Sequence, residues 1–232
     1  MKNFFFSNVN NFRYERKFYI ERLKKEDVEA MLKLHPAIFR EIYHERTINN
    51  IYLDLFNLQN YFDNLNGIDR RLKVRIRWYG NLLGLIENPM LELKLKHNLH
   101  CGKLASPLKS FTIDNNFSIG VMRSVFKNSS LNEALSLYLK ELNFSLLNSY
   151  NRKYFLSADK GYRITLDTNL SSYGLSPYSN NFLYKVSDYI GVILELKYNK
   201  PQDVFVENIT NYFPFRMTRN SKYAAGIMKL ST

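Results

Sequence analysis

The stretch Asp69-Arg-Arg-Leu-Lys-Val-Arg-Ile-Arg-Trp-Tyr79 alternates charged and apolar side chains over nearly its whole length. Successive side chains of a β-strand point to opposite faces of the sheet, so residues two apart share an environment. The charged residues of one parity are Arg71, Lys73, Arg75 and Arg77, and the apolar residues of the other are Leu72, Val74, Ile76 and Trp78. The stretch therefore predicts a strand with one basic face and one buried apolar face.

Four further stretches repeat this design. Their predicted charged faces are Arg13, Glu15 and Lys17; Glu92, Lys94 and Lys96; Arg163 and Asp167; and Glu195 and Lys197. For any single strand, a solvated polar face is the simpler interpretation. The five faces are mostly Arg and Lys, however, and in three of them a glutamate stands two residues before a lysine. Like charges this close repel one another, so the set indicates an anion bound among them.

The remaining periodicity predicts an α+β fold dominated by antiparallel strands. We expect strands at 13–20, 47–55, 69–79, 90–96, 146–156, 162–168 and 189–198, with helices near 26–38, 117–126, 131–142 and 204–212. No linker-like segment interrupts the chain, so we expect one domain over residues 1–232. If the apolar faces pack beneath the helices, the charged faces converge inside a closed barrel. Such an interior must hold a ligand, because unpaired buried charge is costly.

The overall charge points to a polyanionic partner. The chain has 33 Lys and Arg against 21 Asp and Glu, a net charge of +12, which fits nucleic acid, an acidic membrane or polyphosphate. Arg and Lys inside a barrel suit a linear phosphate chain, and Glu can hold Mg²⁺ or Mn²⁺ between phosphates. The single cysteine, Cys101, which we interpret as a loop residue, excludes an intrachain disulfide. With no apolar run of spanning length, we expect a cytoplasmic protein.

Seven short motifs occur in order along the chain. They are Arg13-Tyr-Glu-Arg-Lys-Phe18, Lys73-Val-Arg-Ile-Arg-Trp-Tyr79, Leu91-Glu-Leu-Lys94, Asn151-Arg-Lys-Tyr154, Arg163-Ile-Thr-Leu-Asp167, Leu194-Glu-Leu-Lys-Tyr198 and Ser221-Lys-Tyr223. Together they resemble the VTC domain, the catalytic part of the vacuolar transporter chaperone polyphosphate polymerase and a branch of the triphosphate tunnel metalloenzymes. The resemblance implies an eight-stranded tunnel with helices packed outside. In that tunnel the γ-phosphate of ATP would be transferred to a growing polyphosphate chain, with Mn²⁺ or Mg²⁺ required.

The resemblance also implies roles for individual residues. The catalytic residues that it implies are Arg75, Arg77, Arg163, Lys94 and Lys197, and the further phosphate-binding residues are Lys17, Arg152, Ser221 and Lys222. It makes Glu195 the main metal ligand, with Glu92 and Glu15 as lesser candidates. Parity leaves open whether Arg152 or Lys153 faces the tunnel. Asp167 is either a partner of Arg163 or part of a structural ion pair.

Three functions remain open. Besides the polymerase, the same tunnel suits a metal-dependent tripolyphosphatase or nucleoside triphosphatase, in which water is the attacking group. A non-catalytic module that binds polyphosphate or nucleic acid ranks lower, because Glu195 is retained and no helix-turn-helix or aromatic RNA-binding signature is present. Arg13 stands where the wider superfamily has the first Glu of Glu-x-Glu-x-Lys, which disfavours its thiamine-triphosphatase and adenylate-cyclase branches. Coupling to translocation would require a separate membrane protein, through which the chain could associate with a membrane.

Overall fold

The computed structural model describes residues 2–7, 13–98 and 100–231. The strands are β1 (Arg13–Ile20), β2 (Arg40–Asp54), β3 (Arg70–Tyr79), β4 (Gly84–Ile86), β5 (Met90–His97), β6 (His100–Pro107), β7 (Phe111–Ile113), β8 (Asn143–Leu156), β9 (Tyr162–Tyr173), β10 (Lys185–Asp188) and β11 (Val192–Tyr198). The helices are α1 (Lys2–Ser7), α2 (Lys25–Leu34), α3 (Gln59–Leu65), α4 (Ile119–Asn128), α5 (Glu133–Lys140), the 3-10 helix η1 (Lys200–Phe205), α6 (Glu207–Thr210) and α7 (Lys222–Ser231). None of the helices in these ranges is long and apolar enough to cross a membrane.

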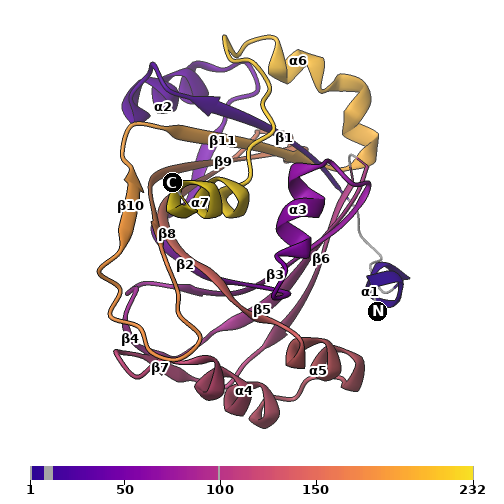
Figure 1. The fold of residues 1–232 in the computed structure, drawn as a ribbon. Helices are drawn as coiled ribbons and strands as arrows, with labels where there is room; N and C mark the ends of the chain where they lie inside the picture. The colour runs from indigo at the N-terminus through magenta and orange to yellow at the C-terminus, as the bar shows by residue number, and fades with distance from the viewer. Residues whose placement is uncertain (1, 8–12, 99, 232) are drawn as a thin grey trace.

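Eight strands form one antiparallel barrel. Their order around the barrel is β9-β11-β1-β6-β5-β3-β2-β8, and pairing of β8 with β9 closes the ring, while β10 extends the sheet beside β9 (Figure 1). The short strands β4 and β7 pair separately. Each of the eight strands pairs with two neighbours in the ring, and the side chains of a barrel strand alternate between the lumen and the outside. The predicted eight-stranded tunnel is confirmed.

Two apolar cores lie outside the barrel. In the first core, the apolar faces of β3 and β5 pack against α4 and α5. Helix α4 contributes an apolar stripe at Ile119, Met122, Val125 and Phe126. The second packs β1, β9 and β11 against α2 and α6, around Val28, Leu32 and Ile209. Because these helices bury the apolar faces, the alternate faces of the same strands must point into the lumen.

The strand register confirms that the charged faces share the lumen. Lys17 on β1 is opposite Glu195 on β11, and Arg75 on β3 is opposite Glu92 on β5. Arg16 has the opposite parity from Glu15 and Lys17 and lies on the outer face of β1, where its Nε donates to the Tyr198 hydroxyl at 2.9 Å. The charged faces of β1, β3, β5 and β11 therefore line one interior, which Asp167 of β9 also enters, whereas Arg163 of β9 is exposed.

Helices α3 and α7 lie across one end of the barrel, within the outline of the strands (Figure 1). Tyr223 of α7 stacks on Tyr52 of β2, with ring centroids 4.8 Å apart, and donates its hydroxyl to Asp54 at 2.6 Å. The same Asp54 carboxylate accepts the backbone N–H groups of Asn60 and Tyr61 in α3. One buried carboxylate thus joins the end of β2 to both helices.

The chain segment before α7 completes the barrel wall. β1 pairs with β6 only at Arg13 and Tyr14, so the rest of that edge of β1 lacks a neighbouring barrel strand. The segment 217–221 occupies it: Thr218 donates its backbone N–H to the Lys17 carbonyl at 2.8 Å, and Met217 bridges to Phe18. This pairing brings Ser221 and Lys222 to the lumen.

Several element predictions need correction. Cys101 and Gly102 lie in the strand β6, not in a loop, and Cys101 pairs with Lys96 across the hairpin. β2 begins at residue 40 instead of 47, and the segment 189–191 lies outside β11. The region predicted as one helix over 204–212 is the 3-10 helix η1 followed by the single turn α6. Short helices and hairpin partners depend on tertiary pairing, which periodicity in one segment does not report.

Candidate phosphate-binding tunnel

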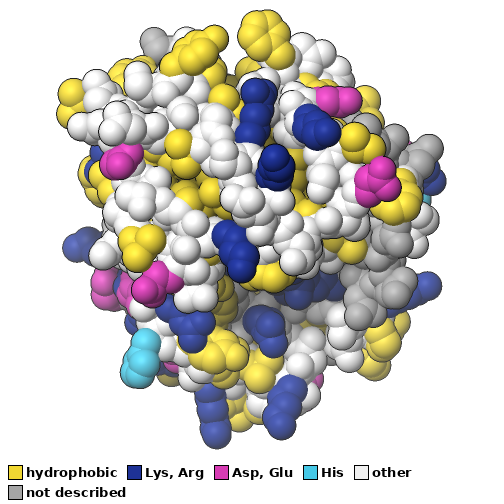
Figure 2. Space-filling model, turned by 90° about the horizontal axis from the view of Figure 1, so that it is seen from below, with side chains coloured by type: hydrophobic (Ala, Val, Ile, Leu, Met, Phe, Trp, Pro, Cys, Tyr) yellow, Lys and Arg dark blue, Asp and Glu magenta, His cyan; other side chains and the backbone are white. Residues whose placement is uncertain are grey.

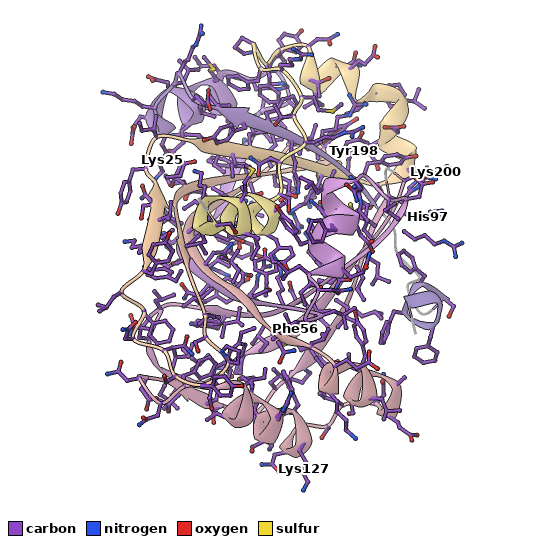
Figure 3. All side chains as sticks on the ribbon, viewed as in Figure 1. Lys25, Phe56, His97, Lys127, Tyr198 and Lys200 are labelled. Atoms are coloured by element: carbon purple, nitrogen blue, oxygen red, sulfur yellow. The ribbon has the colours of Figure 1, made fainter. Side chains whose placement is uncertain are left out.

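The lumen holds a cavity of ≈ 90 Å³ whose lining is dominated by cations. Ten of its sixteen lining residues are Arg or Lys: Arg13, Lys17, Lys73, Arg75, Arg77, Lys94, Lys103, Arg152, Lys197 and Lys222. The others are Tyr52, Tyr150, Glu195, Asn220, Ser221 and Tyr223. Figure 3 shows side chains filling the space within the ring of strands. So many cations in a confined space attract a polyanion strongly.

One cluster in the lumen is built around Glu92. Its Oε2 accepts two hydrogen bonds from Arg75, at 2.8 Å from Nε and 2.6 Å from Nη2, and Arg77 Nη1 lies 3.6 Å away. Lys103 donates to Oε1 at 3.1 Å. Burial would raise the pKa of Glu92, but Arg75, Arg77 and Lys103 hold it well below the usual value. Glu92 is therefore an ionised anchor that orients the two arginines.

A second cluster is built around Glu195. Lys197 Nζ lies 2.9 Å from Oε2, Lys17 Nζ lies 3.3 Å from Oε1, and Arg152 Nη2 lies 3.7 Å from Oε2. Burial would raise the pKa of Glu195, but Lys197 and Lys17 hold it well below the usual value. Burial lowers the pKa of Lys197 to about 8 despite the opposing effect of Glu195.

A third cluster answers the question that parity left open. Arg152 points into the lumen and donates to both oxygens of Asp167, whereas Lys153 points outward to Glu29, at 2.9 Å. Lys222 also pairs with Asp167. Asp167 is thus the partner of Arg152 and Lys222, not of Arg163. Burial would raise its pKa, but the two cations lower it to about 2.

Lys73 is held next to the C-terminal segment. Its Nζ donates to Ser221 Oγ at 2.8 Å. Burial lowers the pKa of Lys73 well below its usual value, and the neighbouring Lys17 and Lys94 lower it further. An anion in the cavity would relieve this repulsion, because a negative charge favours the protonated amine.

The predicted site residues divide into those that line the cavity and those that do not. Lining residues are Arg75, Arg77, Lys94, Lys197, Lys17, Arg152, Ser221, Lys222 and Glu195. Glu92 and Glu15 point inward but do not line the cavity, because each carboxylate is paired with a neighbouring arginine. Arg163 has the inward parity, opposite Lys197, yet its side chain is exposed at the end of β9 and does not line the cavity.

Sequence reasoning missed seven lining residues as site candidates. Arg13 and Lys73 carried the parity signal, and Asn220 and Tyr223 stand on either side of Ser221 and Lys222. Lys103 lies on β6, which was not recognised as a strand. Tyr52 and Tyr150 face the lumen from strands where tyrosine is equally common in a core, so only the barrel geometry reveals them.

The carboxylates fit a metal ion shared with phosphate. Among the described residues, no three His, Cys, Asp or Glu side chains gather as a protein-only metal site. Glu15 and Glu195 are neighbours across β1 and β11, close enough for Glu195 to act on the pKa of Glu15. Burial and Glu195 raise that pKa, but Lys94, Lys197 and Lys17 lower it overall, so both carboxylates are ionised. Mg²⁺ commonly binds one or two carboxylates together with substrate phosphates, which these residues suit.

Comparison with known proteins identifies the family of this chain. The sequence profile of the VTC domain matches residues 12–231. A search among curated proteins finds no match. A candidate adenylate cyclase from Vibrio parahaemolyticus has a similar structure, with a TM-score of 0.53, 10% identity, and coverage of 94% of this chain and 99% of the other. A Hippeastrum adenylyl cyclase candidate described as having a dominant triphosphatase activity gives a TM-score of 0.52, 14% identity, and coverage of 94% and 95%. At such identities the likeness shows the shared tunnel fold alone. Because the family profile covers nearly the whole length, the chain belongs to the VTC domain family.

Proposed function

We propose that the chain is a polyphosphate polymerase, which transfers the γ-phosphate of ATP to a growing polyphosphate chain inside the barrel. The observation that carries the proposal is the lumen itself, where ten Arg and Lys side chains line one narrow cavity. A linear chain of phosphates matches this shape and charge, whereas a compact anion would contact only part of the lining.

The chemistry needs positioning more than a covalent nucleophile. In phosphoryl transfer, negative charge on the non-bridging oxygens must be stabilised while the attacking and leaving oxygens line up. Arg75 and Arg77, oriented by Glu92, would hold the transferring group, and Arg152, Lys197 and Lys222 would hold the neighbouring phosphates. Glu195 and Glu15 would hold Mg²⁺ or Mn²⁺, which neutralises phosphate charge when bound. The terminal phosphate of the chain would then attack the γ-phosphorus of ATP in line, and ADP would leave.

Hydrolysis is the second candidate, since the Hippeastrum protein with the same fold is described as a triphosphatase. The two reactions differ in the attacking group, phosphate or water. Incubation with ATP and Mn²⁺ would separate them: polymerase activity yields long polyphosphate on a gel, whereas hydrolase activity yields free phosphate without polymer. Free phosphate alone would replace the polymerase proposal with the triphosphatase.

The metal role of Glu195 has its own test. We expect Glu195→Gln to abolish metal-dependent turnover, because the amide keeps the shape of the side chain but loses the charge that binds the cation. Circular dichroism would check that the variant is folded. The matched control is Glu207→Gln, an exposed carboxylate on α6, which should retain activity. Full turnover by Glu195→Gln would remove this residue from the metal site.

A further inference from the structure

Four side chains from three adjacent strands gather at the barrel end opposite α7. The guanidinium of Arg46 on β2 lies over three tyrosine rings, with its Cζ 4.5 Å from the centroid of Tyr43, 5.6 Å from that of Tyr79 and 5.9 Å from that of Tyr154. The rings of Tyr43 and Tyr154 meet edge to face at 5.6 Å. We call these four residues the tyrosine rim.

The tyrosine rim is not part of either apolar core. Tyr43 and Tyr79 expose 50% and 52% of their surface, and Arg46 is exposed as well. Tyrosines that serve packing alone are usually buried further, and exposed aromatic rings grouped with an arginine are typical of binding surfaces. Neither the fold nor the phosphate-binding role accounts for this cluster.

The tyrosine rim is continuous with the cavity. The β2–β8 register places Arg46 opposite Arg152, which lines the lumen. The Arg152 guanidinium lies 5.9 Å from the ring centroid of Tyr154 on its outer side and 5.2 Å from that of Tyr150 on its inner side. The tyrosine rim therefore contacts Arg152, which is one of the cations that line the phosphate cavity.

We propose that the tyrosine rim binds the base of a nucleoside triphosphate whose phosphates extend into the lumen. The inference rests on the proposed function and adds the site that would distinguish a nucleotide from an inorganic phosphate chain. Every nucleobase has a π-face that stacks on tyrosine rings and on a guanidinium plane. Inorganic polyphosphate has no such group, so the rim contributes to binding of the phosphate donor but not of the polymer.

Binding measurements on ATP and inorganic tripolyphosphate test this directly. Calorimetry at one pH and one Mg²⁺ concentration would compare wild type with a Tyr43→Ala, Tyr79→Ala double variant. Since base stacking contributes about 1–3 kcal/mol, we expect the Kd for ATP to rise about tenfold. The Kd for tripolyphosphate should stay within about twofold, because the phosphate cavity is unchanged. The double Tyr→Phe variant should keep tight ATP binding, since the rings remain.

The other outcomes are decisive as well. Tyr178→Ala, at a tyrosine that is 84% exposed and outside the rim, is the matched control and should change neither Kd. If the double alanine variant weakens both ligands equally, or neither, the base-binding role is wrong while the phosphate tunnel stands. If wild type binds neither ATP nor tripolyphosphate, both the rim proposal and the proposed function fail.

Discussion

The hydroxyl of Tyr150 lies among cations at the centre of the lumen. Arg77 Nη2 donates to it at 3.3 Å, and the Lys222 and Arg152 charges lie 4.8 Å and 5.2 Å from the ring centroid. Burial alone would raise the pKa of Tyr150, but Arg152, Arg77 and Lys222 lower it to about 7. Below that pH the hydroxyl is neutral; above it, a phenolate competes with phosphate for the same cations.

This titration predicts a pH effect on binding. As pH rises from about 6 to about 8, wild-type affinity for tripolyphosphate should fall roughly tenfold relative to that of Tyr150→Phe, because the phenolate must regain its proton when the anion binds. Metal-free calorimetry would measure both proteins. Taking the ratio at each pH removes the titration of the ligand itself. A ratio that does not change with pH would show that Tyr150 stays neutral.

Helix α7 closes one barrel end because a glycine permits close packing. A Cβ at Gly226 would lie 2.6 Å from Leu146 Cδ2 and 2.9 Å from Ser172 Oγ. Gly226→Ala should therefore push α7 away from β8 and β9, at a cost of about 1–3 kcal/mol in unfolding free energy. Tripolyphosphate binding should weaken too, since Ser221 and Lys222 stand at the start of α7. Denaturant unfolding and calorimetry would measure the two effects.

Gly120 in α4 is the matched control. The nearest atom to its added Cβ is Ser118 Oγ at 3.6 Å, an ordinary contact. Alanine is the better helix former by about 1 kcal/mol, so Gly120→Ala should leave stability equal or higher and binding unchanged. If Gly226→Ala and Gly120→Ala change stability and binding equally, close packing at Gly226 does not hold α7 in place.

Over the whole molecule, the barrel connects two apolar cores, and a different pair of helices covers each core. Trp78, the only tryptophan, lies in the core beneath α4 and α5, whereas the second core lies beneath α2 and α6. Since β8 and β9 close the ring, neither core can unfold without breaking hydrogen bonds between barrel strands. Trp78 fluorescence and far-ultraviolet circular dichroism should therefore give coincident denaturant midpoints. Earlier loss of fluorescence would show that the first core unfolds separately.

The outer surface carries Lys and Arg side chains as well. Figure 2 shows Lys and Arg side chains scattered over one face among hydrophobic and polar groups. Charges exposed to water are screened by salt, whereas those in the lumen are shielded from it. The net charge of +12 does not choose among polyanions, and our proposal of a linear phosphate chain depends instead on the ten Arg and Lys side chains that line the lumen.

Alternation along five strands was enough, within the sequence, to determine which side chains share a face. The register of β1, β3, β5 and β11 bears this out, because the two-residue period of a strand is a local property of the backbone. Only the tertiary structure decided which carboxylate holds which cation, that Arg152 and not Lys153 faces inward, and that Arg163 lies beyond the cavity. These depend on the curvature and closure of the barrel, which bring together strands distant in sequence. The tyrosine rim was equally hidden, since its residues come from three strands and meet only where the barrel ends.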